Sequence, residues 1–150
     1  MIGRRACLAI GLVGLPISIS RAQSVKPAPQ RLVIKGYDPV AYFVDGKPVQ
    51  GKPEYEAIYD DARYRFASAQ HLELFKSDPD RYAPQFAGAC AAGIAMGMKL
   101  EADPEQWLIV DGKLFVFSSE KTVDTMRADS AGMIAKGQEN WKTLASAPYQ

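Results

Sequence analysis

Three residues with sulfur-bearing side chains lie close together in the sequence, within a run of small residues. Cys90 begins the run, and Met96 and Met98 end it. Thiolate and thioether groups are soft ligands, of the kind that hold Cu(I). Free cysteine and methionine also fill gaps in apolar cores, and the small neighbouring residues permit such close packing. The segment therefore has two interpretations, a soft-metal site and a core segment.

The chain contains a single histidine, His71. Its imidazole could serve as a metal ligand or as a proton-transfer group. The alternative is a polar residue at the exposed start of a helix. One histidine excludes every site that requires two, and the sequence contains neither a glycine-rich phosphate loop nor a serine nucleophile elbow.

A third candidate is a polar pocket that combines a carboxylate with aromatic hydroxyl groups. Its residues are Tyr37, Asp38, Tyr42 and Tyr64. In this interpretation Tyr37 and Asp38 lie near the Cys90 segment and orient a small ligand. The alternative is that Asp38 caps a helix and that the tyrosines belong to the core.

The N-terminus has the three parts of a secretory signal. Residues 1–5 are basic, residues 6–19 are apolar and uncharged, and small residues at 20 and 22 suit a cleavage site after Ala22. The apolar run is shorter than the roughly 20 residues that a bilayer span needs, so no permanent membrane span is expected. The adjacent Arg4 and Arg5 fit the twin-arginine export route. We predict an exported, periplasmic protein with a signal over 1–22, a linker over 23–31 and one domain over 32–146.

Export would change the charge and the cysteine count. The chain has 18 basic and 17 acidic residues, and the signal holds three arginines and no acid, so the mature net charge is −2. No basic face for nucleic acid follows from that balance. Cys90 would be the only remaining cysteine, which excludes an intramolecular disulfide. It is then a buried residue, a reactive thiol, a metal ligand or half of an intermolecular bridge.

One pattern occurs twice, over 55–78 and 107–129, at a constant offset of 51. Each copy predicts a strand, a tight turn, a returning strand, and a helix that begins after a capping serine, Ser68 or Ser119. The alternative is that any two hairpin–helix units look alike. We expect an α+β fold: a small antiparallel sheet from two hairpin–helix units, with short helices and a C-terminal helix over 131–144. We also expect a first strand over 31–34 and one helical turn over 39–43.

The stretch from Gly36 to Met98 resembles the YHS domain. The matching motifs are Gly-Tyr-Asp-Pro-Val-Ala-Tyr-Phe (36–43), Tyr-x-Phe-x-Ser (64–68) and Asp-Pro-Asp-Arg-Tyr-Ala-Pro (78–84). The resemblance implies that metal-handling relatives place three cysteines at positions that here are Ala41, Ala67 and His71. A methyl group cannot coordinate a metal, and a closed zinc site needs about four ligands. The resemblance therefore implies that at most His71 survives from that ligand set, which argues against metal binding at that location.

These observations favour a small exported binding module without catalytic activity. It would bind copper, zinc or a small ligand near Cys90, or hold a protein partner. One alternative is a redox enzyme that uses the single thiol, which requires an accessible thiolate. Another is a structural or interaction domain, which requires an exposed apolar patch.

Overall fold

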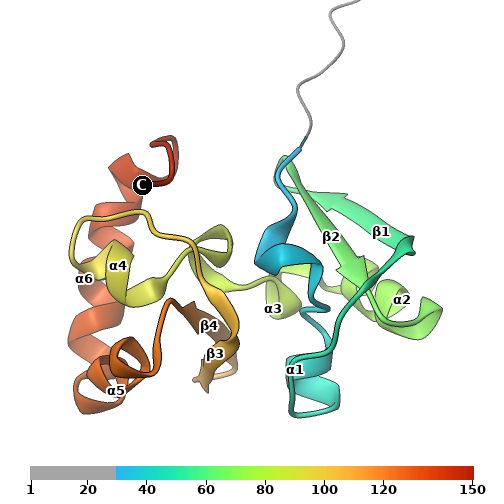
Figure 1. Ribbon diagram of the computed structural model, residues 1–150, viewed down its shortest axis with the longest axis horizontal. Helices are drawn as coiled ribbons and strands as arrows, with labels where there is room; N and C mark the ends of the chain where they lie inside the picture. The colour runs from blue at the N-terminus through green and yellow to red at the C-terminus, as the bar shows by residue number, and fades with distance from the viewer. Residues whose placement is uncertain (1–29) are drawn as a thin grey trace, which may run out of the picture.

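The computed structural model describes residues 30–150, which form two lobes with the same order of elements (Figure 1). The first lobe contains η1 (Val33–Gly36), α1 (Ala41–Val44), β1 (Lys52–Tyr59), β2 (Ala62–Phe66), α2 (Ala69–Ser77) and α3 (Pro79–Tyr82). The second lobe contains η2 (Gln85–Gly88), α4 (Ala91–Ala95), β3 (Asp103–Val110), β4 (Lys113–Phe117), α5 (Glu120–Ala128) and α6 (Ser130–Leu144). The predicted signal lies outside the described residues, so export stays a prediction.

The predicted repeat is confirmed, and it extends to irregular features of the backbone. The register shift that follows Lys52 in the first hairpin recurs after Asp103 in the second. Asp78 and Asp129, which end the equivalent helices α2 and α5, share nearly the same backbone angles. Ser68 and Ser119 cap α2 and α5 through their hydroxyl oxygens, as predicted. Because bulges and caps recur at matching positions, the two lobes are copies of one unit.

The α+β class is confirmed, but the hairpins do not join into the single small sheet that we expected. β1 pairs only with β2, and β3 only with β4, as two separate antiparallel sheets. Beside β2 lies one isolated bridge, Leu32 to Arg63, and beside β4 lies another, Cys90 to Val116. Each hairpin is therefore flanked on one side by an irregular segment of its own lobe.

The prediction of a first strand over 31–34 is wrong. Ile34 and Lys35 have positive φ values of 49° and 50°, within the 3₁₀ segment η1. Phe86 and Ala87 in η2 have the same unusual conformation. The apolar side chain of Ile34 is buried by this tight turn rather than by a sheet, which is why its β-branched character misled the prediction.

The two lobes share part of their cores. Leu114 and Val116 of β4 belong to the same apolar cluster as Phe66 and Phe75 of the first lobe. Tyr42 of α1 packs edge-on against Trp107 of β3, with ring centroids 5.2 Å apart. Since burial of these side chains depends on both lobes, neither lobe has a complete core alone.

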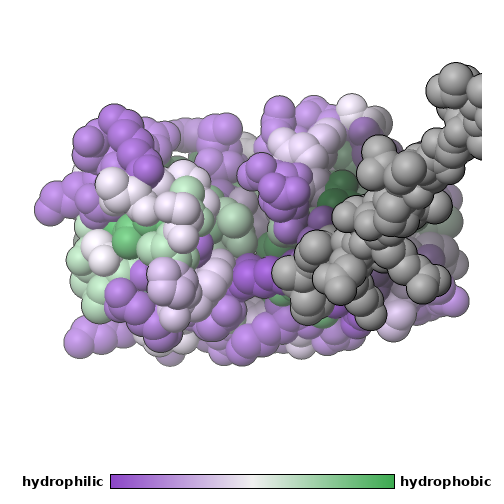
Figure 2. All heavy atoms as spheres, turned by 90° about the horizontal axis from the view of Figure 1, so that it is seen from above, coloured by the Kyte–Doolittle hydropathy of each residue, from purple (hydrophilic) through white to green (hydrophobic). Residues whose placement is uncertain are grey.

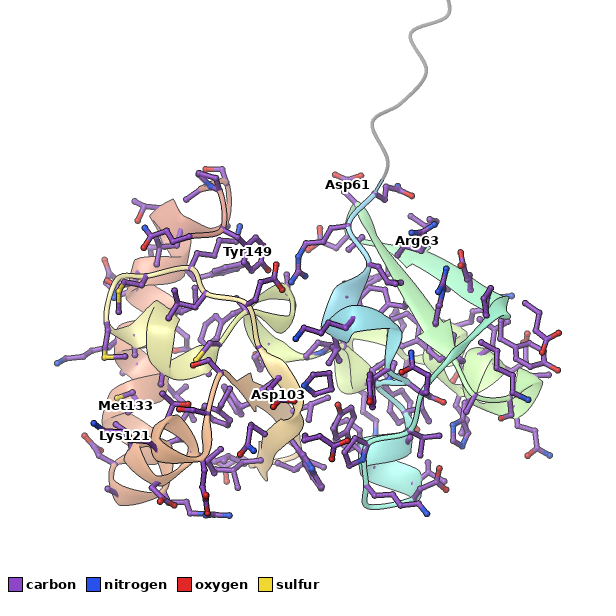
Figure 3. The ribbon with its side chains drawn as sticks, viewed as in Figure 1. Asp61, Arg63, Asp103, Lys121, Met133 and Tyr149 are labelled. Carbon is purple, nitrogen blue, oxygen red and sulfur yellow. The ribbon has the colours of Figure 1, made fainter. Side chains whose placement is uncertain are left out.

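The domain's contacts extend beyond 32–146 at both ends. The guanidinium of Arg31 bonds to Glu101 at 2.7 Å and lies over the ring of Tyr149. Lys99 Nζ donates to the carbonyls of Ala145 and Ala147, which fixes the C-terminal tail that follows α6. Figure 3 shows Tyr149 on the side of the second lobe that faces the first.

Figure 2 shows green and pale-green residues gathered over part of the second lobe, with hydrophilic residues around them. The exposed large apolar side chains come from separate elements: Val44, Ile58, Leu74, Met96, Met98 and Ile109. Among residues 30–150, no helix has the length and apolar character needed to cross a membrane.

The hairpin turns allow a direct test of backbone conformation. Asp61, labelled at the tip of the first hairpin in Figure 3, and its neighbour Asp60 both have positive φ, as do Asp111 and Gly112 in the second. A Cβ added at Gly112 would meet no atom within 4 Å, so only the backbone angle opposes a side chain there. We expect Gly112→Ala to lower the free energy of unfolding by roughly 1 kcal/mol. Gly112→Asn should lose less of the free energy of unfolding than Gly112→Ala, because asparagine tolerates this backbone conformation. Urea unfolding of both variants checks this, and equal losses would contradict the backbone explanation.

Candidate functional site

The carboxylate of Asp38 is the most completely bonded polar group of the first lobe. Its side chain has no exposed surface. Oδ1 accepts from the backbone N–H groups of Val40 at 2.8 Å and Ala41 at 3.3 Å. Oδ2 accepts from the backbone N–H of Ala67 at 2.8 Å and lies 2.6 Å from Nδ1 of His71. The carboxylate therefore joins α1, the end of β2 and the start of α2.

His71 is held by this carboxylate rather than left at an exposed helix start. Ser68 caps α2 and accepts from the backbone N–H of His71, which places the imidazole on the first turn beside Asp38. Only 11% of the side chain is exposed, so the expectation of an exposed polar residue is wrong. When Nδ1 donates its proton to Asp38, Nε2 keeps its lone pair. Nε2 lies 4.0 Å from Oδ2 of Asp45, whose side chain is 38% exposed.

The three positions implied by the family resemblance meet at this carboxylate. Ala41 and Ala67 direct their backbone N–H groups at Asp38, and His71 adds its ring nitrogen. Sequence reasoning identified these positions separately, but it missed the Asp38–His71 pair and the neighbouring Asp45. The signal that could have found the pair is the family resemblance, which groups His71 with Ala41, three residues after Asp38.

Cys90 is the counterpart of Asp38 in the second lobe, since η1 and η2 begin 52 residues apart. Its Sγ accepts from the backbone N–H of Gly93 at 3.4 Å and of Ser118 at 3.3 Å. Ser118 follows β4 just as Ala67 follows β2. The thiol therefore anchors α4 to the end of β4 in the way that the carboxylate anchors α1 to β2.

The structure separates the sulfur atoms that the soft-metal hypothesis grouped. Cys90 caps the N-terminal end of α4 and is fully buried. Met96 caps the opposite end and is 56% exposed, and Met98, which follows, is 37% exposed. Within residues 30–150, no three His, Cys, Asp or Glu side chains are grouped as metal ligands. This geometry favours the packing interpretation for Cys90.

The predicted polar pocket of tyrosines is divided among separate environments. Tyr42 is buried and its hydroxyl donates to the carbonyl of Pro104 at 2.8 Å. Tyr64 is buried against the ring of Phe75. Burial raises the pKa of both phenols well above the ordinary value of 10.0. Tyr37 is only partly buried, and Asp38 faces His71 instead of the Cys90 segment.

Comparison with known proteins places the family signal in the first lobe. Residues 40–86 match the YHS domain family, from the start of α1 into η2. No curated protein and no solved structure shows significant similarity to the chain. The match includes Asp45 and His71 and ends where the second copy of the fold begins. Residues 40–86 of the first lobe are therefore similar to the YHS domain family.

Proposed function

We propose that the protein is an exported, non-catalytic binding module whose first lobe holds a divalent transition metal, zinc or copper, at His71 and Asp45. One observation carries this proposal. The buried carboxylate of Asp38 binds Nδ1 of His71 at 2.6 Å, and Nε2 on the other side of the ring faces the carboxylate of Asp45. Metal-binding histidines characteristically donate their second ring N–H to a carboxylate in this way.

The residues present fit such an ion with a small adjustment. Metal bonds of about 2.1 Å at tetrahedral or octahedral angles place two ligand atoms about 3.0–3.4 Å apart. Nε2 and the Asp45 oxygen are 4.0 Å apart, so a side-chain movement of less than about 1 Å suffices. Asp45 can move because it is more than one-third exposed, whereas His71 is fixed by Asp38. Imidazole with carboxylate suits zinc and Cu(II) better than Cu(I).

Two protein ligands leave the remaining coordination positions to water or to a second molecule. An open site of this kind exchanges its ion readily, which suits a module that receives and passes on metal. Redox chemistry at Cys90 is disfavoured because the fully buried thiol offers no route to a substrate. The N-terminal signal pattern supports export, which would place the module where metal ions enter the cell envelope.

Metal titration of the purified protein tests the site. We expect His71→Ala to weaken zinc or Cu(II) binding by at least about tenfold, with a smaller loss for Asp45→Asn. Cys90→Ala is the control, because it removes the thiol on which the soft-metal hypothesis depends and leaves the first lobe intact. It should leave metal affinity unchanged. Wild-type affinity in His71→Ala would refute the proposed site, and loss of binding in Cys90→Ala would restore the soft-metal hypothesis.

A further inference from the structure

A groove of about 570 Å³ lies between β3 and one face of α5. Its strand side is formed by five consecutive residues, Glu105–Ile109, and its helix side by Glu120, Val123 and Arg127. Successive side chains of a strand point to opposite faces, so a groove over one face would contact every second residue. Contact with five residues in succession shows that the groove runs along the edge of β3.

The backbone at this edge has hydrogen-bonding capacity to spare. β3 pairs with β4 alone, through a register interrupted between Asp103 and Trp107. Within residues 30–150, no backbone hydrogen bond joins Gln106–Ile109 to any element other than β4. An unpaired strand edge presents a row of N–H and C=O groups that another extended chain can engage.

The charges of the groove indicate which kind of chain fits. Arg127 is paired with Asp124 at 3.0 Å. Glu105 and Glu120 are exposed, and neither forms an ion pair within the described part of the chain. Val123, which is only 4% exposed, provides an apolar floor between them. The groove thus offers a strand edge, an apolar floor and two unpaired negative charges.

The geometry points to β3 and α5 as a docking site for an extended, basic peptide segment of a partner protein, which adds a strand to the β3–β4 hairpin. Addition of a strand in a groove beside a helix is an established mode of peptide recognition. Five residues of such a strand span about 16 Å. Their alternating side chains would place apolar groups on Val123 and lysine or arginine beside Glu105 and Glu120.

The site is independent of the metal proposal, because it lies in the second lobe and uses none of the residues around Asp38. Its counterpart in the first lobe differs in charge pattern. Glu56 in β1, which corresponds to Trp107 in β3, is paired with Arg65 at 2.9 Å. The position of Glu120 is occupied there by Ala69. The equivalent strand edge therefore lacks the acidic pair that would attract a basic segment.

A capped heptapeptide of alternating lysine and valine provides the probe. We expect it to bind the full protein and to protect outward-pointing amides of Gln106–Ile109 from hydrogen exchange. Two matched peptides separate the contributions. Glutamate in place of lysine should abolish binding through charge repulsion, and N-methylation of alternate amides should abolish it by removing the backbone donors.

Exposed charge reversals in the protein complete the test. Glu105→Lys combined with Glu120→Lys should weaken peptide binding by about tenfold or more. Glu54→Lys, at the equivalent exposed position of β1, should leave it unchanged. Equal affinity for the N-methylated peptide, or protection in β1 instead of β3, would overturn the proposal. So would protection of Gln106–Ile109 that rises with protein concentration without peptide, because a second copy would then be the occupant.

Discussion

Replacement of Asp38 by alanine should destabilise the protein by about 3–5 kcal/mol. The carboxylate is fully buried and accepts from three backbone N–H groups in addition to the imidazole of His71. Its removal leaves those donors buried without partners, and each unsatisfied group adds a desolvation penalty. Because the bonds connect α1, β2 and α2, their loss should loosen the whole first lobe.

Urea unfolding at neutral pH measures this effect. Asp45→Ala is the matched control, since it removes an exposed carboxylate from the same neighbourhood and should change stability by less than about 0.5 kcal/mol. Cys90→Ala, at the equivalent position of the second lobe, should cost less than Asp38→Ala because a thiol is a weak acceptor. A loss below about 1 kcal/mol in Asp38→Ala would show that the carboxylate does not organise the lobe.

Alkaline pH should destabilise the protein steeply once it exceeds the ordinary tyrosine pKa of 10.0. Burial raises the pKa of Tyr42 and of Tyr64 in the folded state, with Glu105 adding to the effect at Tyr42 and Asp60 at Tyr64. The folded state therefore holds these protons when the unfolded state has released them. The stabilisation from the two protonated phenols is complete below pH 10. Above pH 10 the free energy of unfolding falls by about 1.4 kcal/mol per pH unit for each tyrosine, or about 2.7 kcal/mol per pH unit for both.

The free energy of unfolding measured between pH 8 and pH 11.5 tests this expectation. Tyr64→Phe should reduce the alkaline slope by about 1.4 kcal/mol per pH unit and retain the ring packing on Phe75. Lys99 has the opposite effect. Burial and the charge of Arg31 lower the pKa of Lys99, so its contribution to the free energy of unfolding rises as the pH increases toward 10.5. An unchanged slope in Tyr64→Phe would mean that the phenol ionises without unfolding.

The features that the sequence predicted correctly depend on neighbours along the chain. Ser68 and Ser119 accept from N–H groups three residues away, so their roles can be predicted without a tertiary fold. The Asp111-Gly112 turn and the hairpin that it closes are equally local. The offset of 51 revealed the repeat because cap, turn and strand recur together in each copy.

The candidate site could be predicted only in part. The sequence indicates both His71 and Asp38 as candidates but links them to different hypotheses, His71 to a metal site and Asp38 to a pocket of tyrosines. They are 33 residues apart, and their contact exists only because α1 and the end of β2 pack together. Cys90 was grouped with Met96 and Met98 by sequence distance, although α4 separates the buried thiol from the exposed thioethers.

Residue patterns alone predict the α+β class, the two hairpin–helix units, their capping residues and the closing helix, because each follows from hydrogen bonds and apolar spacing within a few residues. Three features emerge from long-range packing instead: the hairpins remain separate sheets, Ile34 lies in a left-handed turn, and Asp38 binds His71. These outcomes depend on which distant groups satisfy a buried carboxylate or cover a strand edge. Contacts between distant segments determine these features, and local residue patterns do not predict such contacts.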